Sequence, residues 1–160
     1  MSQQMERKEK VRSIEEAPRF ITPEELVEKF RRLGIGAEYK PDILNGRMKE
    51  IILRIPLDKK LDVQVYEHHS EDKKHFYWKW FGFTIKYGNE NGEFVIDHTV
   101  FPEFSTPDMN TDTTVFFYFN GKREAYTIKN ASVWFAESFG TLDVYIQPLF
   151  PDEELEIISH

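Results

Sequence analysis

The chain has 160 residues and no cysteine, so we expect one domain with a single core, and disulfides, zinc fingers and thiol catalysis are excluded. Hydrophobic residues make up 40% and charged residues 31%, as in soluble globular proteins, and no apolar run approaches the roughly 18 residues that a membrane span needs. The net charge of −7 argues against a general nucleic-acid coat, which needs a strongly basic surface.

Residues 1–17 alternate charges with few large apolar side chains, and we interpret them as a flexible charged arm. A single α+β domain is predicted to follow at 18–150, with an acidic tail at 151–160. The arm has no apolar stretch of the kind found in secretory signals. We therefore expect a cytoplasmic protein without membrane attachment.

The first predicted element is a helix in ITPEELVEKFRRLGIG. Thr22 can cap it, Pro23 suits its first turn, and Glu25 stands three residues after Thr22, which completes a capping box. Gly34 is expected to end the helix in a left-handed conformation.

After the helix the apolar period changes from 3.6 to 2, which is typical of half-buried strands. TTVFFYF is apolar on both faces and predicts a central strand. ASVWFAESF fits a helix or a strand, and its aromatic residues favour a strand. The predicted inward faces hold Ile51, Leu53 and Ile55, then Leu61, Val63 and Val65, then Phe94, Ile96, His98 and Val100, and finally Leu142, Val144 and Ile146.

Turn residues predict hairpins at GNENG (88–92) and NGKR (120–123). In the second hairpin, a two-residue Asn120–Gly121 turn would pair Phe117 with Glu124. A four-residue loop would instead pair Phe117 with Tyr126. Because the second register matches apolar with apolar residues, it is preferred.

The strand HFYWKWFGFTIKY changes its apolar phase at Trp80 and Phe81, next to Gly82. A bulge at Gly82 would restore the buried face, as would a strand that crosses between two cores. Together these elements predict an α+β fold in which an N-terminal helix packs on a large antiparallel, meander-like sheet, curled into a half-barrel.

Three of the five histidines lie in YEHHSEDKKHFYW, at 66–78. His69, Asp72 and His75 form a candidate metal set, because imidazole and carboxylate groups bind divalent ions. They would converge only across a loop, and no HxH or HExxH spacing is present. A polar hairpin tip is therefore the favoured interpretation, with no cofactor.

Asp42 followed by Asp58-Lys59-Lys60 resembles in outline the acids and lysine of a magnesium-dependent nuclease, and 72–74 repeats the Asp-Lys-Lys triplet. Pro and Asp are equally typical of turns at strand ends, which is the interpretation we favour. Nucleophile elbows and complete phosphate-binding glycine loops are absent from the sequence.

Lys73, Lys74, Lys79, Tyr77 and Trp78 could stack on and neutralise a nucleic-acid single strand. Their surroundings are acidic, however, and aromatic residues at period 2 usually belong to a core. Nucleic acid is therefore disfavoured as a partner.

Charge is distributed unevenly: residues 1–60 carry 14 basic and 11 acidic side chains, whereas residues 61–160 carry 7 and 17. We interpret the chain as a non-enzymatic accessory module, of an inhibitor or immunity type, that binds a basic protein partner. A metal-dependent phosphodiester hydrolase and a structural or virion-type subunit remain alternatives. The predicted binding residues are Tyr77, Trp78, Trp80, Asp152, Glu153, Glu154 and Glu156.

Overall fold

The computed structural model describes residues 19–41, 49–69, 79–100, 112–150 and 152–160. Within these ranges the chain forms one helix and eleven strands. In chain order they are β1 (Arg19–Ile21), α2 (Pro23–Arg31), β2 (Gly36–Lys40), β3 (Glu50–Pro56), β4 (Leu61–His69), β5 (Lys79–Asn89), β6 (Gly92–Val100), β7 (Thr113–Phe119), β8 (Lys122–Lys129), β9 (Ala131–Ser138), β10 (Thr141–Pro148) and β11 (Glu156–Ser159).

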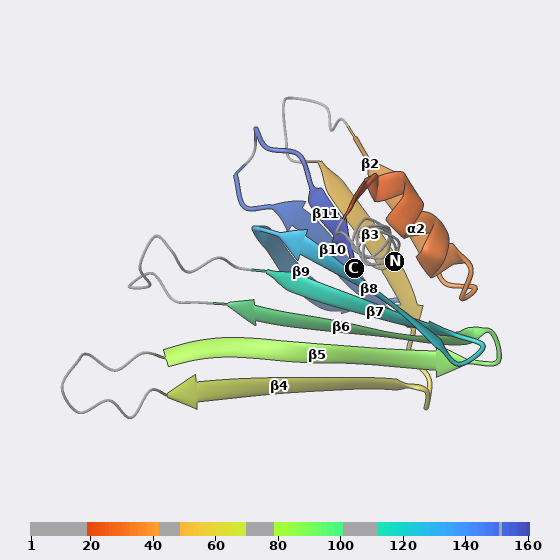
Figure 1. The fold of residues 1–160 in the computed structure, drawn as a ribbon. Helices are drawn as coiled ribbons and strands as arrows, with labels where there is room; N and C mark the ends of the chain where they lie inside the picture. Colours follow the sequence, from red (N-terminus) through yellow and green to blue (C-terminus); the bar gives the residue numbers. More distant parts are fainter. Residues whose placement is uncertain (1–18, 42–48, 70–78, 101–111, 151) are drawn as a thin grey trace, which may run out of the picture.

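The strands form two antiparallel sheets (Figure 1). The larger has seven strands in the order β1-β11-β8-β7-β6-β5-β4, and the smaller has four in the order β2-β3-β10-β9. From β4 to β8 each strand pairs with the next in sequence, which is the predicted meander. The α+β class with a large antiparallel sheet is confirmed. Both sheets are open, so the half-barrel stays a prediction.

Helix α2 begins and ends as its sequence predicts. The Glu25 N–H donates to Thr22 Oγ1 at 3.2 Å, and the Thr22 hydroxyl approaches the Glu25 carboxylate at 3.4 Å. Gly34 follows the helix with a φ of 78°. In the part of the chain that the structure describes, no helix is long and apolar enough to cross a membrane.

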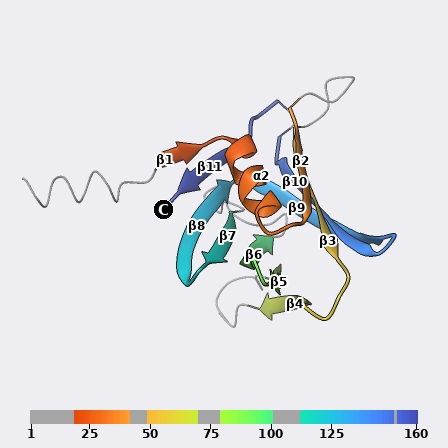
Figure 2. The ribbon, with the colours of Figure 1, turned by 90° about the vertical axis from the view of Figure 1, so that its right-hand side faces the viewer.

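The core lies between the large sheet on one side and α2 with the small sheet on the other (Figure 2). The Phe30 ring of α2 packs edge-on against Phe94 of β6 and Phe117 of β7, with centroids 5.2 and 4.8 Å away. Phe83 of β5 meets Phe135 of β9 at 5.0 Å and so joins the two sheets. Aromatic contacts of this geometry stabilise a core beyond the area they bury.

The hairpin at Asn120 and Gly121 has a two-residue turn, so the predicted four-residue loop is wrong. Both residues have positive φ, 50° and 80°, as a type I′ turn requires, and its twist matches that of paired strands. Phe117 consequently pairs with Glu124. The Glu124 carboxylate accepts a hydrogen bond from Lys29 of α2 at 3.0 Å. The observed register places the acidic Glu124 opposite the apolar Phe117. The ion pair with Lys29 compensates this mismatch.

Strand β5 has no bulge at Gly82, contrary to the prediction, and it stays in the large sheet. Its register with Tyr66 of β4 and Thr99 of β6 is unbroken. A Cβ at Gly82 would lie 2.3 Å from the Tyr66 ring, whose hydroxyl donates to Asp97 at 3.0 Å. The glycine allows this close approach of the ring.

The last residues of the chain belong to the sheet. β11 lies between β1 and β8, and Leu155 and Ile157 are buried in the core. This end, expected to be an acidic tail, therefore contributes to folding. The predicted arm at 1–17 lies outside the described residues. Residues 131–138 form a strand, as favoured.

Candidate functional site

Two edge strands, β4 of the large sheet and β9 of the small sheet, border one groove with a volume of about 690 Å³. This size is within the range of ligand sites in proteins. The groove is lined by Leu57, Asp58, Leu61, Val63, Phe135, Ala136, Glu137 and Leu142.

One wall of the groove is a strand face that the core leaves uncovered. Val63 and Val65 pair with Ile85 and Phe83 of β5 and share their face of the sheet. Ile85 is fully buried, whereas Val65 is 70% exposed. Val65 lies on the predicted face of the sheet, the one that carries the core residues. No described residue covers its side chain enough to bury it. Leu61 and Val63 form the apolar wall of the groove, and Val65, the next residue on the same face of β4, lies just beyond the lining and continues this apolar face.

The opposite wall comes from the β9–β10 hairpin. Phe135 stands on its inner face and packs against Phe83, and the buried Leu142 of β10 lines the groove on the same face. Phe139 at the hairpin tip is fully exposed. The Leu57 N–H donates to the Gly140 carbonyl at 3.0 Å, which ties the β3–β4 connection to this tip. The groove thus has an apolar floor and an apolar end.

The charged side chains of the groove are acidic. Asp58 and Glu137 are the only charged residues among the described residues that line it. One carboxylate oxygen of Asp58 accepts the Lys60 N–H at 2.9 Å, which holds the turn before β4. The Lys60 ammonium lies 3.6 Å from Glu90, so its charge is directed to another carboxylate. A cationic ligand suits this rim.

A second hollow of about 610 Å³ lies on α2, among Glu25, Glu28, Lys29, Arg31 and Arg32. Its charges are of both signs. Arg31 pairs with Glu28 at 2.7 Å and Lys29 with Glu124 at 3.0 Å. Such paired surface charges offer little to a ligand, so the groove is the stronger candidate.

The metal hypothesis for the histidine stretch falls mostly outside the described residues. His69 ends β4, opposite Lys79, while Asp72 and His75 are not described. Within the described ranges no group of three metal-ligating residues comes together. Of the hydrolase set, Asp58 is a turn residue as favoured, and Asp42 is not described.

The predicted aromatic site is also largely outside the described residues. Tyr77 and Trp78 are not described, and the backbone of Trp80 pairs with His68 at the start of β5. These residues stay a prediction.

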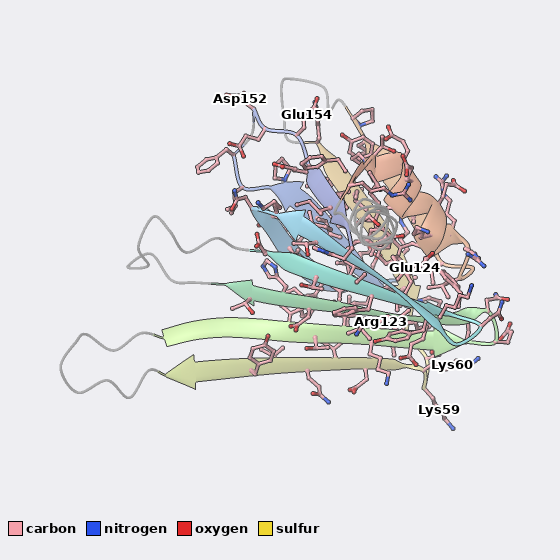
Figure 3. The ribbon with its side chains drawn as sticks, viewed as in Figure 1. Lys59, Lys60, Arg123, Glu124, Asp152 and Glu154 are labelled. Atoms are coloured by element: carbon pink, nitrogen blue, oxygen red, sulfur yellow. The ribbon has the colours of Figure 1, made fainter. Side chains whose placement is uncertain are left out.

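The predicted acidic site lies away from the groove. Asp152, Glu153 and Glu154 are exposed ahead of β11, and Glu156 is exposed on it. Glu154 forms an ion pair with Lys49, and this hydrogen bond lowers the pKa of the Glu154 carboxyl. Asp152 and Glu154 lie at the opposite side of the molecule from Lys59 and Lys60, which follow Asp58 (Figure 3).

An aromatic pair on the outer face of the small sheet was not predicted from the sequence. Trp134 of β9 stacks on Tyr145 of β10, with ring centroids 3.9 Å apart and planes inclined by 12°. Trp134 is 45% exposed. The signal was the out-of-phase aromatic residue in each strand, which becomes visible only when the register of the hairpin is known.

Comparison with known proteins finds no family model, no curated protein and no solved structure that matches the chain.

Proposed function

We propose that the protein is a non-enzymatic binding module that holds an extended segment of a protein partner in the groove between β4 and β9. The observation that carries the proposal is that β4 and β9, each an edge strand with one side unpaired among the described residues, border the same apolar hollow. Open edges bind extended backbones through their unpaired N–H and C=O groups, and alternate side chains of the bound segment enter the hollow.

The chemistry of the groove specifies the partner segment. The apolar lining residues Leu61, Val63 and Phe135 favour apolar side chains at alternate positions of the bound segment. Asp58 and Glu137 favour lysine or arginine beside them, and residues 61–160 carry an excess of ten acidic side chains over basic ones. We therefore expect a segment that alternates apolar and basic residues.

Two further predictions belong to this proposal. Asp152, Glu153, Glu154 and Glu156 attract a basic partner from a distance, and Tyr77, Trp78 and Trp80 supply a second contact with it. A segment seated between β4 and β9 would lie between the edges of the two sheets. The half-barrel predicted for the large sheet also stays part of this proposal.

The test is a selection of random twelve-residue peptides on the immobilised full chain. We expect the selected peptides to alternate apolar with basic residues and to bind in the micromolar range or better. Val65→Lys should weaken this binding at least tenfold, because it puts a positive charge next to the apolar wall. This charge repels the basic side chains of the peptide. Val65 is 70% exposed, so the fold should tolerate lysine.

The matched control is Gln64→Lys, which adds the same charge at an exposed position on the opposite face of β4. It should change binding less than twofold. Peptides without alternation or basic residues, or equal effects of the two lysine variants, would contradict the proposal.

A further inference from the structure

The hydrogen-bond register of the β9–β10 hairpin determines which backbone groups of β9 are open. The Leu149 N–H donates to the Asn130 carbonyl at 2.9 Å, in line with the pairing of the two strands. Bonded and non-bonded pairs alternate along an antiparallel ladder. The groups directed away from β10 are therefore those of Val133, Phe135 and Glu137.

No other described strand pairs with that edge. Phe135 and Glu137 also line the groove. The open backbone groups and the apolar hollow thus belong to the same stretch of chain, at the end of β9 nearest the hairpin tip.

On the outer face, Trp134 is stacked on one side and the residue is 45% exposed. Tyr145, its partner in register on β10, stacks against one face of the indole at 3.9 Å. The other face is directed toward the free edge of β9, where a strand next to β9 would place a side chain about 5 Å from Trp134 between Cβ atoms. A planar group at that position would extend the stack.

We propose that the partner segment joins β9 as an added strand and stacks an arginine on the open face of Trp134. This inference rests on the proposed function and specifies how the segment binds. Its backbone bonds to Val133, Phe135 and Glu137. Apolar side chains on its inner face fill the groove beside Phe135, and the arginine lies on its outer face.

Arginine suits this position better than other residues. A guanidinium group is planar, stays charged and stacks on indole rings, whereas lysine offers only a point charge. Asp143, which lies two residues from Tyr145 on the outer face of β10, supplies negative charge on the face that holds the stack. Arg54, the partner of Asp143 in register, is directed to Glu38 at 3.2 Å.

The first experiment is an N-methyl scan of the selected peptide against the full chain. Methylation removes one backbone donor at a time and leaves every side chain in place. An added strand uses the donors of alternate residues, so about tenfold losses should recur at every second position. Losses without this period would overturn the added strand.

The second experiment tests the edge from the protein side. Glu137→Pro removes an N–H that is directed away from β10, and proline is tolerated on edge strands. It should lower affinity about tenfold, whereas Glu137→Gln, which removes only the charge, should cost about threefold. Equal effects of the two variants would overturn the role of the β9 backbone.

The stack is tested by a double-mutant cycle between Trp134→Leu and arginine→glutamine in the peptide. Each change alone should weaken binding about fivefold, and the two together little more than either alone. Fully additive effects, or selected peptides without arginine, would overturn the stack.

These outcomes separate the inference from the proposed function. If Val65→Lys abolishes binding but Glu137→Pro and Trp134→Leu do not, the groove binds the peptide in another way and only the inference fails. If Val65→Lys has no effect, the proposed function itself fails. A dimer of the protein alone, dissolved by Glu137→Pro, would make a second copy of the chain the occupant and overturn the inference.

Discussion

His98 is a core histidine, and its burial makes stability depend on pH. It is 1% exposed, and its Nδ1 lies 2.7 Å from Thr113 Oγ1. Burial lowers the pKa of His98 from 6.5 to about 4, against the opposing effect of Asp97. The ring is therefore neutral in the fold, whereas the unfolded chain takes up a proton below pH 6.5. Stability from this group is present above 6.5 and is lost as pH falls toward 4.

We expect the free energy of unfolding to fall by up to roughly 1.4 kcal/mol per pH unit from this group between pH 6.5 and 4. Urea unfolding at several pH values measures it. His98→Gln should be less stable at pH 7.5 but should show a shallower slope over that range, since glutamine does not titrate. Equal slopes in the two proteins would show that His98 is not held neutral.

Gly82 leaves the space that the Tyr66 ring occupies on the neighbouring strand. A Cβ would lie 2.3 Å from the ring atoms, so Gly82→Ala must displace the ring from Asp97. We expect a loss of about 1–3 kcal/mol in the free energy of unfolding. In a Tyr66→Ser background the same substitution should cost much less, because the obstructing ring is gone. An equal cost in both backgrounds would contradict the close approach.

At the scale of elements, the N-cap of α2 is the most direct test of local sequence. Thr22→Ala removes the oxygen that accepts the Glu25 N–H and should lower the free energy of unfolding by about 1 kcal/mol. Thr22→Ser keeps the oxygen and should stay within a few tenths of wild type. Thermal and urea unfolding of the three proteins check this, and an unchanged alanine variant would refute the cap.

Features governed by neighbouring residues could be predicted from sequence. The helix ends at Thr22 and Gly34 follow from capping chemistry, and the buried alternation of β6 and β10 follows from a period of two. The turn at Asn120 failed because apolar matching was weighed above turn chemistry. The compensating partner of Glu124 is Lys29, which is 95 residues away in sequence.

The candidate site could not be predicted, because it depends on which face stays uncovered. Val63 and Val65 have the same pattern as the core strands, yet α2 and the small sheet leave Val65 exposed. Trp134 and Tyr145 stack only because the hairpin register puts them opposite each other. Sequence periodicity identifies a face but does not identify what packs on it.

At the scale of the whole molecule, charge near the groove and charge far from it should act on different rates. Glu137 lines the groove and should act on dissociation of the bound segment. Asp152 and Glu154 do not line the groove and lie opposite Lys59 and Lys60, which follow the groove residue Asp58, so they act through the long-range field, which governs association. The field reaches about 30 Å at 0.01 M salt but about 8 Å at physiological salt.

Neutralising the four acids by Asp152→Asn, Glu153→Gln, Glu154→Gln and Glu156→Gln should therefore slow association of the selected basic peptide several-fold at low salt. At physiological salt the effect should nearly vanish, and dissociation should not change at either salt. The melting temperature should change little, because all four side chains are exposed and the Glu154–Lys49 pair is an exposed one. Surface-immobilised kinetics at two salt concentrations measure both rates, with Glu137→Gln as the comparison that should speed dissociation. If the association rate depends neither on salt nor on the four substitutions, these acids serve solubility, and association of the peptide depends on the groove alone.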